Sequence, residues 1–121
     1  MPAGMGHRML CSDLIHLQWR KGKGWTRPAN AILEEISPAS ACGHSELPVP
    51  ANSVVRIRRG DKTIEGTVVS CAFDRIGYFA EIEFNAGFEW SLELFRPEHL
   101  FDPRMLAAKP ELRTRTSGTP S

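Results

Sequence analysis

The sequence lacks the features that would place it in a membrane or outside the cell. No run reaches the roughly 18 apolar residues needed to cross a bilayer, because Asp13, His16 and Gln18 interrupt the most hydrophobic early segment. The first residues bring one arginine and no apolar run of secretory length, so no signal peptide is expected. The cysteines are odd in number and lie about thirty residues apart, which does not fit a disulfide framework. These absences predict a soluble protein of a reducing cytoplasm, without a membrane span.

The chain also lacks net charge. Its 15 Lys and Arg residues balance 14 Asp and Glu residues, so no global field draws it to nucleic acid or to an anionic membrane. The charges are nevertheless unevenly placed: Arg20, Lys21, Lys23 and Arg27 share one turn, Arg56, Arg58, Arg59 and Lys62 share one hairpin, and Glu81, Glu83, Glu89, Glu93 and Glu98 fall in the last third. Two interpretations stay open. The cations form a basic patch for a phosphate-bearing ligand, with Trp25 as a stacking face, or they are solvated strand residues paired with acids across the sheet.

No recognised catalytic or metal-binding signature is present. Cys42 and His44 are close enough in sequence to be two zinc ligands, but no second pair completes the four ligands of a structural site. Glu34 and Glu35 are adjacent, so in a strand they point to opposite faces and cannot work as a paired acid and base. We therefore expect no enzymatic activity, no metal and no cofactor.

What is present predicts one small all-β domain. The chain has 121 residues, of which 41% are hydrophobic, and this suits a single folded domain with a tail. Apolar and polar residues alternate with the period of a strand over residues 9–19, 53–59, 63–73 and 78–84. Residues 29–36 are good helix formers, but Pro28 and Pro38 leave room only for a very short helix, so a strand is predicted there. Five or six such strands joined by short turns predict a six-stranded antiparallel β-barrel, since closure removes exposed edges.

The same pattern predicts which residues form the core of this barrel and which segments at the two termini lie outside it. Residues expected to converge inside it include Val55, Ile57, Val69, Ile82 and Phe84, with its mouth near Arg8 and Ser37. We expect residues 1–7 to be a flexible N-terminus, residues 8–101 to form the barrel domain and residues 102–121 to be a largely disordered tail. Short helical turns are predicted at residues 91–95 and around residues 104–108.

One turn carries a resemblance to a known family. The run from Glu35 to Ala41, EISPASA, resembles the D/N-x-S-x-x-G turn of PilZ domains. The segments EGTVV (residues 65–69) and GYFAEIEF (residues 77–84) are similar to the two closing strands of the PilZ barrel. The resemblance covers roughly residues 8–100. It implies a bacterial six-stranded barrel that binds the second messenger cyclic di-GMP.

The resemblance also implies which residues would hold that ligand, and this chain departs from the pattern. Arg8 stands where the second arginine of the family's R-x-x-x-R motif would be, while Gly4 occupies the place of the first. In the turn, Glu35 replaces the shorter Asp or Asn and Ser40 replaces the glycine. The candidate ligand-binding residues are Arg8, Arg20, Lys21, Glu35, Ser37 and Ser40.

Three functional hypotheses follow. The first is a non-enzymatic regulatory module with a degraded cyclic di-GMP site, acting through a protein partner. Its contact surface would include Phe79, Phe88 and Trp90, although for Trp90 packing on residues 91–95 is the favoured interpretation. The alternative is a functional cyclic di-GMP receptor in bacterial signalling. The third, single-stranded nucleic acid bound by the basic turn and Trp25, is disfavoured by the neutral net charge.

Overall fold

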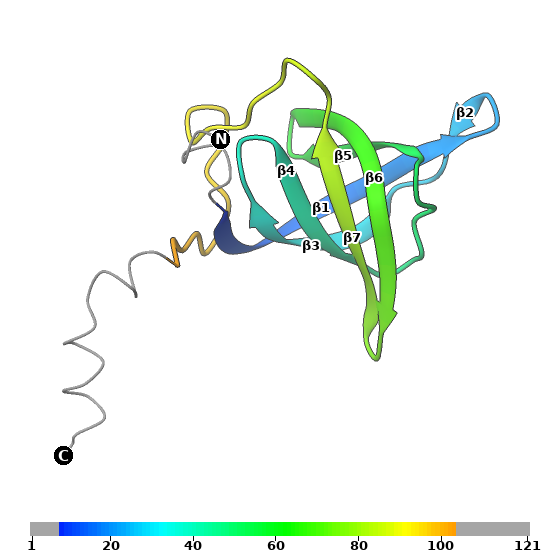
Figure 1. Cartoon of the computed structure of the whole chain (residues 1–121), viewed down its shortest axis with the longest axis horizontal. Helices are drawn as coiled ribbons and strands as arrows, with labels where there is room; N and C mark the ends of the chain where they lie inside the picture. Colours follow the sequence, from blue (N-terminus) through cyan, green and yellow to red (C-terminus); the bar gives the residue numbers. More distant parts are fainter. Residues whose placement is uncertain (1–7, 104–121) are drawn as a thin grey trace.

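The computed structural model describes residues 8–103, which form seven β-strands and no helix (Figure 1). The strands are β1 (Met9–Lys21), β2 (Gly24–Trp25), β3 (Ala29–Ile36), β4 (Ser40–Ser45), β5 (Val54–Arg59), β6 (Lys62–Asp74) and β7 (Gly77–Phe84). Within this part of the chain, no helix has the length and apolar character that a membrane crossing requires. The expected N-terminus (residues 1–7), most of the expected tail and the second helical turn lie outside the described residues.

Six of the strands close into an antiparallel barrel, as the sequence predicts. They pair in the order β1-β3-β4-β7-β6-β5, and β5 pairs again with β1 to complete the cylinder. The short β2 pairs only with the end of β1, so this hairpin extends beyond the barrel wall (Figure 1). Closure leaves the six barrel strands without a free edge, which removes the main route to edge-to-edge aggregation.

The predicted alternation places most core residues correctly. Ile15 and Leu17 of β1 are fully buried. Val55 and Ile57 of β5 and Ile82 of β7 are at most 3% exposed. Residues 29–36 form β3 and not a helix, with every second side chain at the start of the strand buried. Burying one such aliphatic side chain contributes about 1.5–3 kcal/mol, so the apolar set that faces inward supplies most of the driving force for folding.

Val69 is the exception, and it corrects the predicted core. Its side chain is 56% exposed, whereas the neighbouring Val68 is fully buried. The register of β6 against β7 shifts between Val68 and Ser70, so Val69 is the extra residue of a β-bulge. A bulge reverses the inside–outside phase beyond it, because successive side chains in a strand point to opposite faces.

Two more bulges lie beside the same part of the wall. The register of β1 against β3 shifts between Leu10 and Asp13, and that of β3 against β4 shifts between Leu33 and Glu35. These irregularities border one row of paired residues that crosses five strands. The row consists of Leu10, Glu35, Cys42, Glu81 and Ser70. Bulges re-aim side chains, and here they surround the place where Arg8 lies.

The segment after β7 packs on the barrel through aromatic residues. Trp90 is 4% exposed and its indole N–H donates to the backbone oxygen of Phe95 at 3.2 Å. Phe88 packs edge-on against Phe84, with ring centroids 5.4 Å apart. The predicted helical turn at residues 91–95 is a single hydrogen-bonded turn, in which the N–H of Leu94 donates to the oxygen of Ser91 at 3.0 Å. The buried Trp90 therefore belongs to the core and offers no surface to a partner.

Candidate functional site

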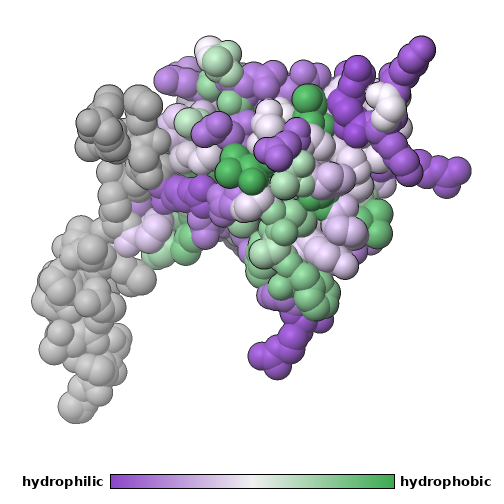
Figure 2. All heavy atoms as spheres, turned by 45° about the vertical axis from the view of Figure 1, so that its right-hand side comes forward, coloured by the Kyte–Doolittle hydropathy of each residue, from purple (hydrophilic) through white to green (hydrophobic). Residues whose placement is uncertain are grey.

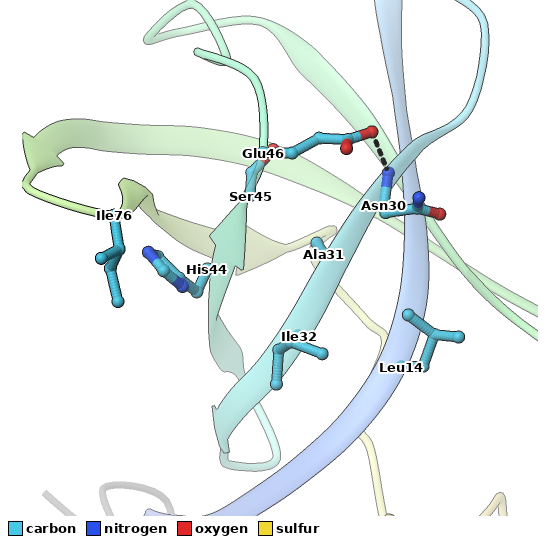
Figure 3. Close-up of a pocket in the computed structure, with 8 residues that line it drawn as sticks. All are labelled: Leu14, Asn30, Ala31, Ile32, His44, Ser45, Glu46 and Ile76. Carbon is cyan, nitrogen blue, oxygen red and sulfur yellow. Dashed lines mark hydrogen bonds between the residues drawn. The ribbon is translucent and has the colours of Figure 1, made fainter.

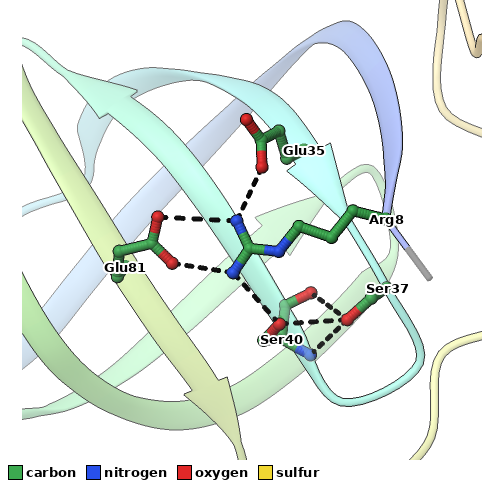
Figure 4. Close-up of polar contacts among 5 residues, drawn as sticks. All are labelled: Arg8, Glu35, Ser37, Ser40 and Glu81. Atoms are coloured by element: carbon green, nitrogen blue, oxygen red, sulfur yellow. Dashed lines mark hydrogen bonds and ion pairs between the residues drawn. The ribbon is translucent and has the colours of Figure 1, made fainter. Parts of the chain in front are cut away.

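Arg8 is the centre of a polar cluster on the outer wall of the barrel. It lies directly before β1 and reaches across β3 and β4 toward β7 (Figure 4). Its Nη1 donates to Glu35 Oε1 at 2.6 Å, and its Nη2 donates to Glu81 Oε1 at 2.8 Å. Longer contacts run from Nη1 to Glu81 Oε2 at 3.5 Å and from Nη2 to Ser40 Oγ at 3.4 Å. A single guanidinium thus holds two carboxylates from two different strands.

The turn between β3 and β4 presents the hydroxyl groups of this cluster. The backbone N–H of Ser37 donates to the oxygen of Ser40 at 2.8 Å, and the N–H of Ser40 donates back to Ser37 Oγ at 3.1 Å. The two hydroxyl oxygens lie 3.0 Å apart. Because Ser37 is 2% exposed and fully engaged, it acts within the turn. Ser40, whose backbone does not adopt a positive φ, directs its hydroxyl toward Arg8.

The ion pairs stabilise the charged forms of both partners. Hydrogen bonding from Arg8 lowers the pKa of Glu81 below its usual 4.5 against the opposing effect of burial. Hydrogen bonds to Glu81 and then to Glu35 raise the pKa of Arg8. Beside them, burial raises the pKa of Cys42 to about 12, with a further contribution from Glu81. The Cys42 thiol is therefore protonated at neutral pH, which makes it a poor nucleophile and a poor metal ligand.

Acidic side chains outnumber the cation at this site. A pocket of about 260 Å³ opens beside Arg8 and is lined also by Ser40, Glu81 and Glu83. The guanidinium contacts the carboxylates of Glu35 and Glu81, and a third acid, Glu83, lines the same pocket. Sites for drug-sized ligands usually have about 300–1,000 Å³, so this pocket is small for a dinucleotide. Its charge also opposes the binding of a phosphate group.

The structure brings together four of the six candidate ligand-binding residues. Arg8, Glu35, Ser37 and Ser40 converge in this cluster (Figure 4). Arg20 and Lys21 do not join them, because they lie at the far end of β1, which is about 40 Å away for an extended strand of this length.

Glu81 is the site residue that the sequence did not reveal. Alternation places it outside, as for any exposed strand acid, and only the pairing of β4 with β7 brings it beside Cys42 and Arg8.

The far end of β1 has the opposite character. Trp25 is covered by Arg56, whose guanidinium carbon lies 3.9 Å from the ring centroid, and by Arg20 at 5.3 Å. Arg56 also pairs with Glu65, at 3.2 Å between Nε and Oε2. The remaining cations at this end form no ion pair within residues 8–103: Arg20, Lys21, Lys23, Arg27 and Arg58. We call these five residues the basic end; hydrophilic side chains project on this side of the molecule in Figure 2.

The two possible zinc ligands have other contacts. Cys42 belongs to the row of Glu81, and the His44 ring stacks on Phe79 with centroids 4.5 Å apart. Among the described residues, no group of three His, Cys, Asp or Glu side chains is placed to hold a metal ion.

Comparison with known proteins gives no family for this chain. No family model, no curated protein and no solved structure matches it.

Proposed function

We propose that this barrel is a non-enzymatic regulatory module of the PilZ type, in bacterial signalling, that has lost its cyclic di-GMP site and acts through contact with another protein. One observation carries the proposal. The guanidinium that would grip the ligand, Arg8, is engaged by the carboxylates of Glu35 and Glu81. An internal ion-pair cluster thus occupies the position of the ligand.

The chemistry of the ligand supports this assignment. Cyclic di-GMP is a dianion whose phosphates and guanine edges are suited to planar, bidentate arginine contacts. To use Arg8, the ligand would have to displace Glu81 and Glu35 and then lie beside a third carboxylate, Glu83. A missing charged hydrogen-bond contact is worth about 1.5–3 kcal/mol, which is roughly ten- to a hundredfold in affinity.

The turn adds a steric reason. Where the family has glycine, the Ser40 side chain lies 3.0 Å from Ser37 Oγ and 3.4 Å from Arg8 Nη2, both measured from its hydroxyl oxygen. This side chain occupies the space that a ligand would need in order to approach the backbone of the turn. The replacement of glycine by Ser40 therefore hinders the approach of a ligand to the turn, and it does not change the backbone conformation that the turn requires.

Other residues bear on the cellular compartment and on nucleic acid as an alternative ligand. Cys11, Cys42 and Cys71 carry free thiols, which is typical of proteins in a reducing cytoplasm. Trp25 is covered by Arg56 and so offers little free ring surface for a nucleic-acid base. A protein partner is the occupant that we favour.

Titration calorimetry with cyclic di-GMP tests the proposal. We expect no binding heat at about 100 µM ligand, a concentration that would saturate a micromolar site. A saturable isotherm with a micromolar or lower Kd would contradict the proposal and establish the alternative, a functional receptor.

A variant with a restored ligand site should gain affinity for cyclic di-GMP. The variant Gly4→Arg, Ser40→Gly, Glu81→Gln returns the missing arginine, clears the turn and frees Arg8 from one carboxylate. We expect it to bind cyclic di-GMP at least about tenfold more tightly than the chain with Gly4→Arg alone. Equal affinities would show that the ion-pair cluster is not what prevents binding.

A further inference from the structure

A row of apolar and aromatic side chains crosses the outside of the barrel. It follows the strand register: Leu14 pairs with Ile32, Ile32 with His44, His44 with Phe79 and Phe79 with Ala72. Leu14, Ile32 and His44 each lie between buried residues of their strands, so they face outward, where antiparallel barrels usually carry polar residues; Phe79 and Ala72 continue the row through the strand register. We call this row the outer belt. Four inter-strand spacings give it a width of about 19 Å.

The outer belt contains a preformed apolar pocket. Its volume is about 200 Å³, and its walls include Leu14, Ile32, His44 and Ile76 (Figure 3). Ile76, at the tip of the hairpin that joins β6 to β7, is 78% exposed, and Leu14 is 57% exposed. Large aliphatic side chains that are this exposed around one pocket are typical of surfaces that bind another macromolecule.

His44 forms part of the wall of this pocket. Its ring stacks on Phe79 at an interplanar angle of 25°, and its Nε2 is buried without a hydrogen-bond partner among residues 8–103. Asp74 Oδ1 lies 3.8 Å from this nitrogen. The ring thus contributes an apolar face to the pocket, since its neighbours are Phe79, Gly77 and Ile76.

Cations adjoin the belt on the β1 side. His16 is the next outward residue of β1 after Leu14 and pairs with both Asn30 and Arg58. A second pocket of about 350 Å³ is lined by His16, Arg58, Pro28 and Gly60, and the first pocket reaches Asn30. The two pockets therefore adjoin along the register, one apolar and one beside the unpaired Arg58.

The acids at this border do not cancel the positive charge of the basic end. Glu46 accepts the backbone N–H of Asn30 at 3.0 Å, and Asp61 lies in the turn after Arg59. Beyond them the cations of the basic end continue along the hairpin of β1 and β2, while Glu65 of β6 is paired with Arg56 of β5. The surface thus runs from apolar to basic in one direction.

We infer that the outer belt and the adjoining basic end dock an acidic amphipathic segment of a partner protein. The inference deepens the proposed function and rests on its claim that the module acts through a protein contact. The apolar pocket receives one aliphatic or aromatic side chain of the segment, and Arg58 with the neighbouring cations faces its carboxylates. Charge complementarity selects this occupant, because the five cations of the basic end adjoin an apolar pocket and outnumber the two acids at this border, Glu46 and Asp61.

Peptide selection on the full chain tests the inference. A phage library of random peptides of about 16 residues is panned on the wild-type protein, and each enriched clone is then tested for binding to the Ile76→Ser variant. This variant should fold normally because the side chain is already 78% exposed. We expect the enriched peptides to combine an excess of Asp and Glu with apolar residues at helical or strand spacing.

Affinities of the selected peptides then locate the site. We expect Ile76→Ser and Ile32→Glu to weaken binding at least about tenfold, and Arg58→Glu about fivefold. The matched control is Leu92→Glu, because Leu92 is 43% exposed but lines neither pocket; its affinity should be unchanged. Basic or uncharged consensus peptides, an absence of discriminating peptides, or equal binding to Ile76→Ser overturns the inference.

Other occupants give distinct results. Concentration-dependent dimerisation that Ile76→Ser abolishes would assign the belt to a second copy of the chain, and binding to anionic vesicles that the same variant abolishes would assign it to a lipid surface; either result overturns the inference. A cyclic di-GMP titration of the same samples separates the two proposals. Binding of the dinucleotide contradicts the proposed loss of its site and leaves the peptide result standing.

Discussion

The two ends of β1 carry arginines in opposite electrostatic states. Before the strand, Arg8 forms ion pairs with Glu35 and Glu81 at 2.6 and 2.8 Å. At its far end, Arg20 lies over Trp25 and forms no ion pair within residues 8–103. Both side chains look alike in the sequence, as arginines that flank one strand.

The difference shows that partners decide what an arginine can do. A guanidinium already held by two carboxylates must lose those hydrogen bonds before it can bind an anion, whereas an unpaired one loses only hydration. The net charge of +1 conceals this contrast, because it sums an acidic cluster and a basic end. The predictions below alter one end at a time.

The largest effect is expected where the strands approach most closely beside the Arg8 cluster. A Cβ at Gly66 would overlap the backbone oxygen of Glu83, and neither backbone can move without breaking the pairing of β6 with β7. Gly66→Ala should therefore lower the free energy of unfolding in urea by about 2–3 kcal/mol. Gly24→Ala, in the hairpin at the far end, meets nothing within 4 Å and should cost less than about 1 kcal/mol. Equal effects would mean that the close approach is absent.

The next effect comes from removing the central cation. Arg8→Met removes the cation that Glu35 and Glu81 share, so we expect a loss of about 1–2 kcal/mol in urea unfolding, reduced by the partial exposure of the groups. Arg20→Met is the matched control and should change stability by less than about 0.5 kcal/mol. Equal losses of unfolding free energy in Arg8→Met and Arg20→Met would contradict the difference between the two ends of β1.

A pH dependence of stability is expected from the Arg8 cluster. The folded state lowers the pKa of Glu81 below 4.5, so its contribution to stability is present above that value and is lost as the pH falls through the folded pKa. Wild type should exceed Glu81→Gln in stability at pH 7, and the two urea midpoints should converge as the pH is lowered below about 4.5. A gap that stays constant with pH would show that the carboxylate charge is irrelevant.

The smallest effect should be local to the basic end. Trp25→Leu removes the ring beneath Arg56 and Arg20, and exposed cation–π contacts are worth about 0.5–1 kcal/mol each. Because β2 lies outside the barrel, we expect faster amide exchange in β2 and at Thr26, whose N–H donates to Trp19, with little change in global stability. Lys23→Leu in the same turn should leave the exchange rates unchanged. A loss of global stability in Trp25→Leu would tie this hairpin to the core.

Prediction of the core from the sequence succeeded where alternation is continuous and failed where it is interrupted. Val55, Ile57, Ile82 and Phe84 are buried as predicted. Val69 is outside, because a bulge in β6 shifts the phase and nothing in the local pattern marks a bulge.

The candidate site was predictable in part for a related reason. Glu35, Ser37 and Ser40 were visible as a short-range turn motif, and Arg8 was visible as half of a second motif before the first strand. Glu81 lies 73 positions from Arg8, and its role depends on which strands become neighbours. The exposed positions of the outer belt were likewise scattered in sequence, and only Phe79 among them was proposed as a contact residue.

The sequence by itself determined the strands, the turns between them and the all-β class, because these depend on alternation and on residues such as proline and glycine that act locally. The tertiary structure alone decided which charges meet. Closing the cylinder brought Glu81 to Arg8 and left the basic end unpaired, since the energy of an ion pair depends on distance in space, and chain order does not set that distance across a barrel.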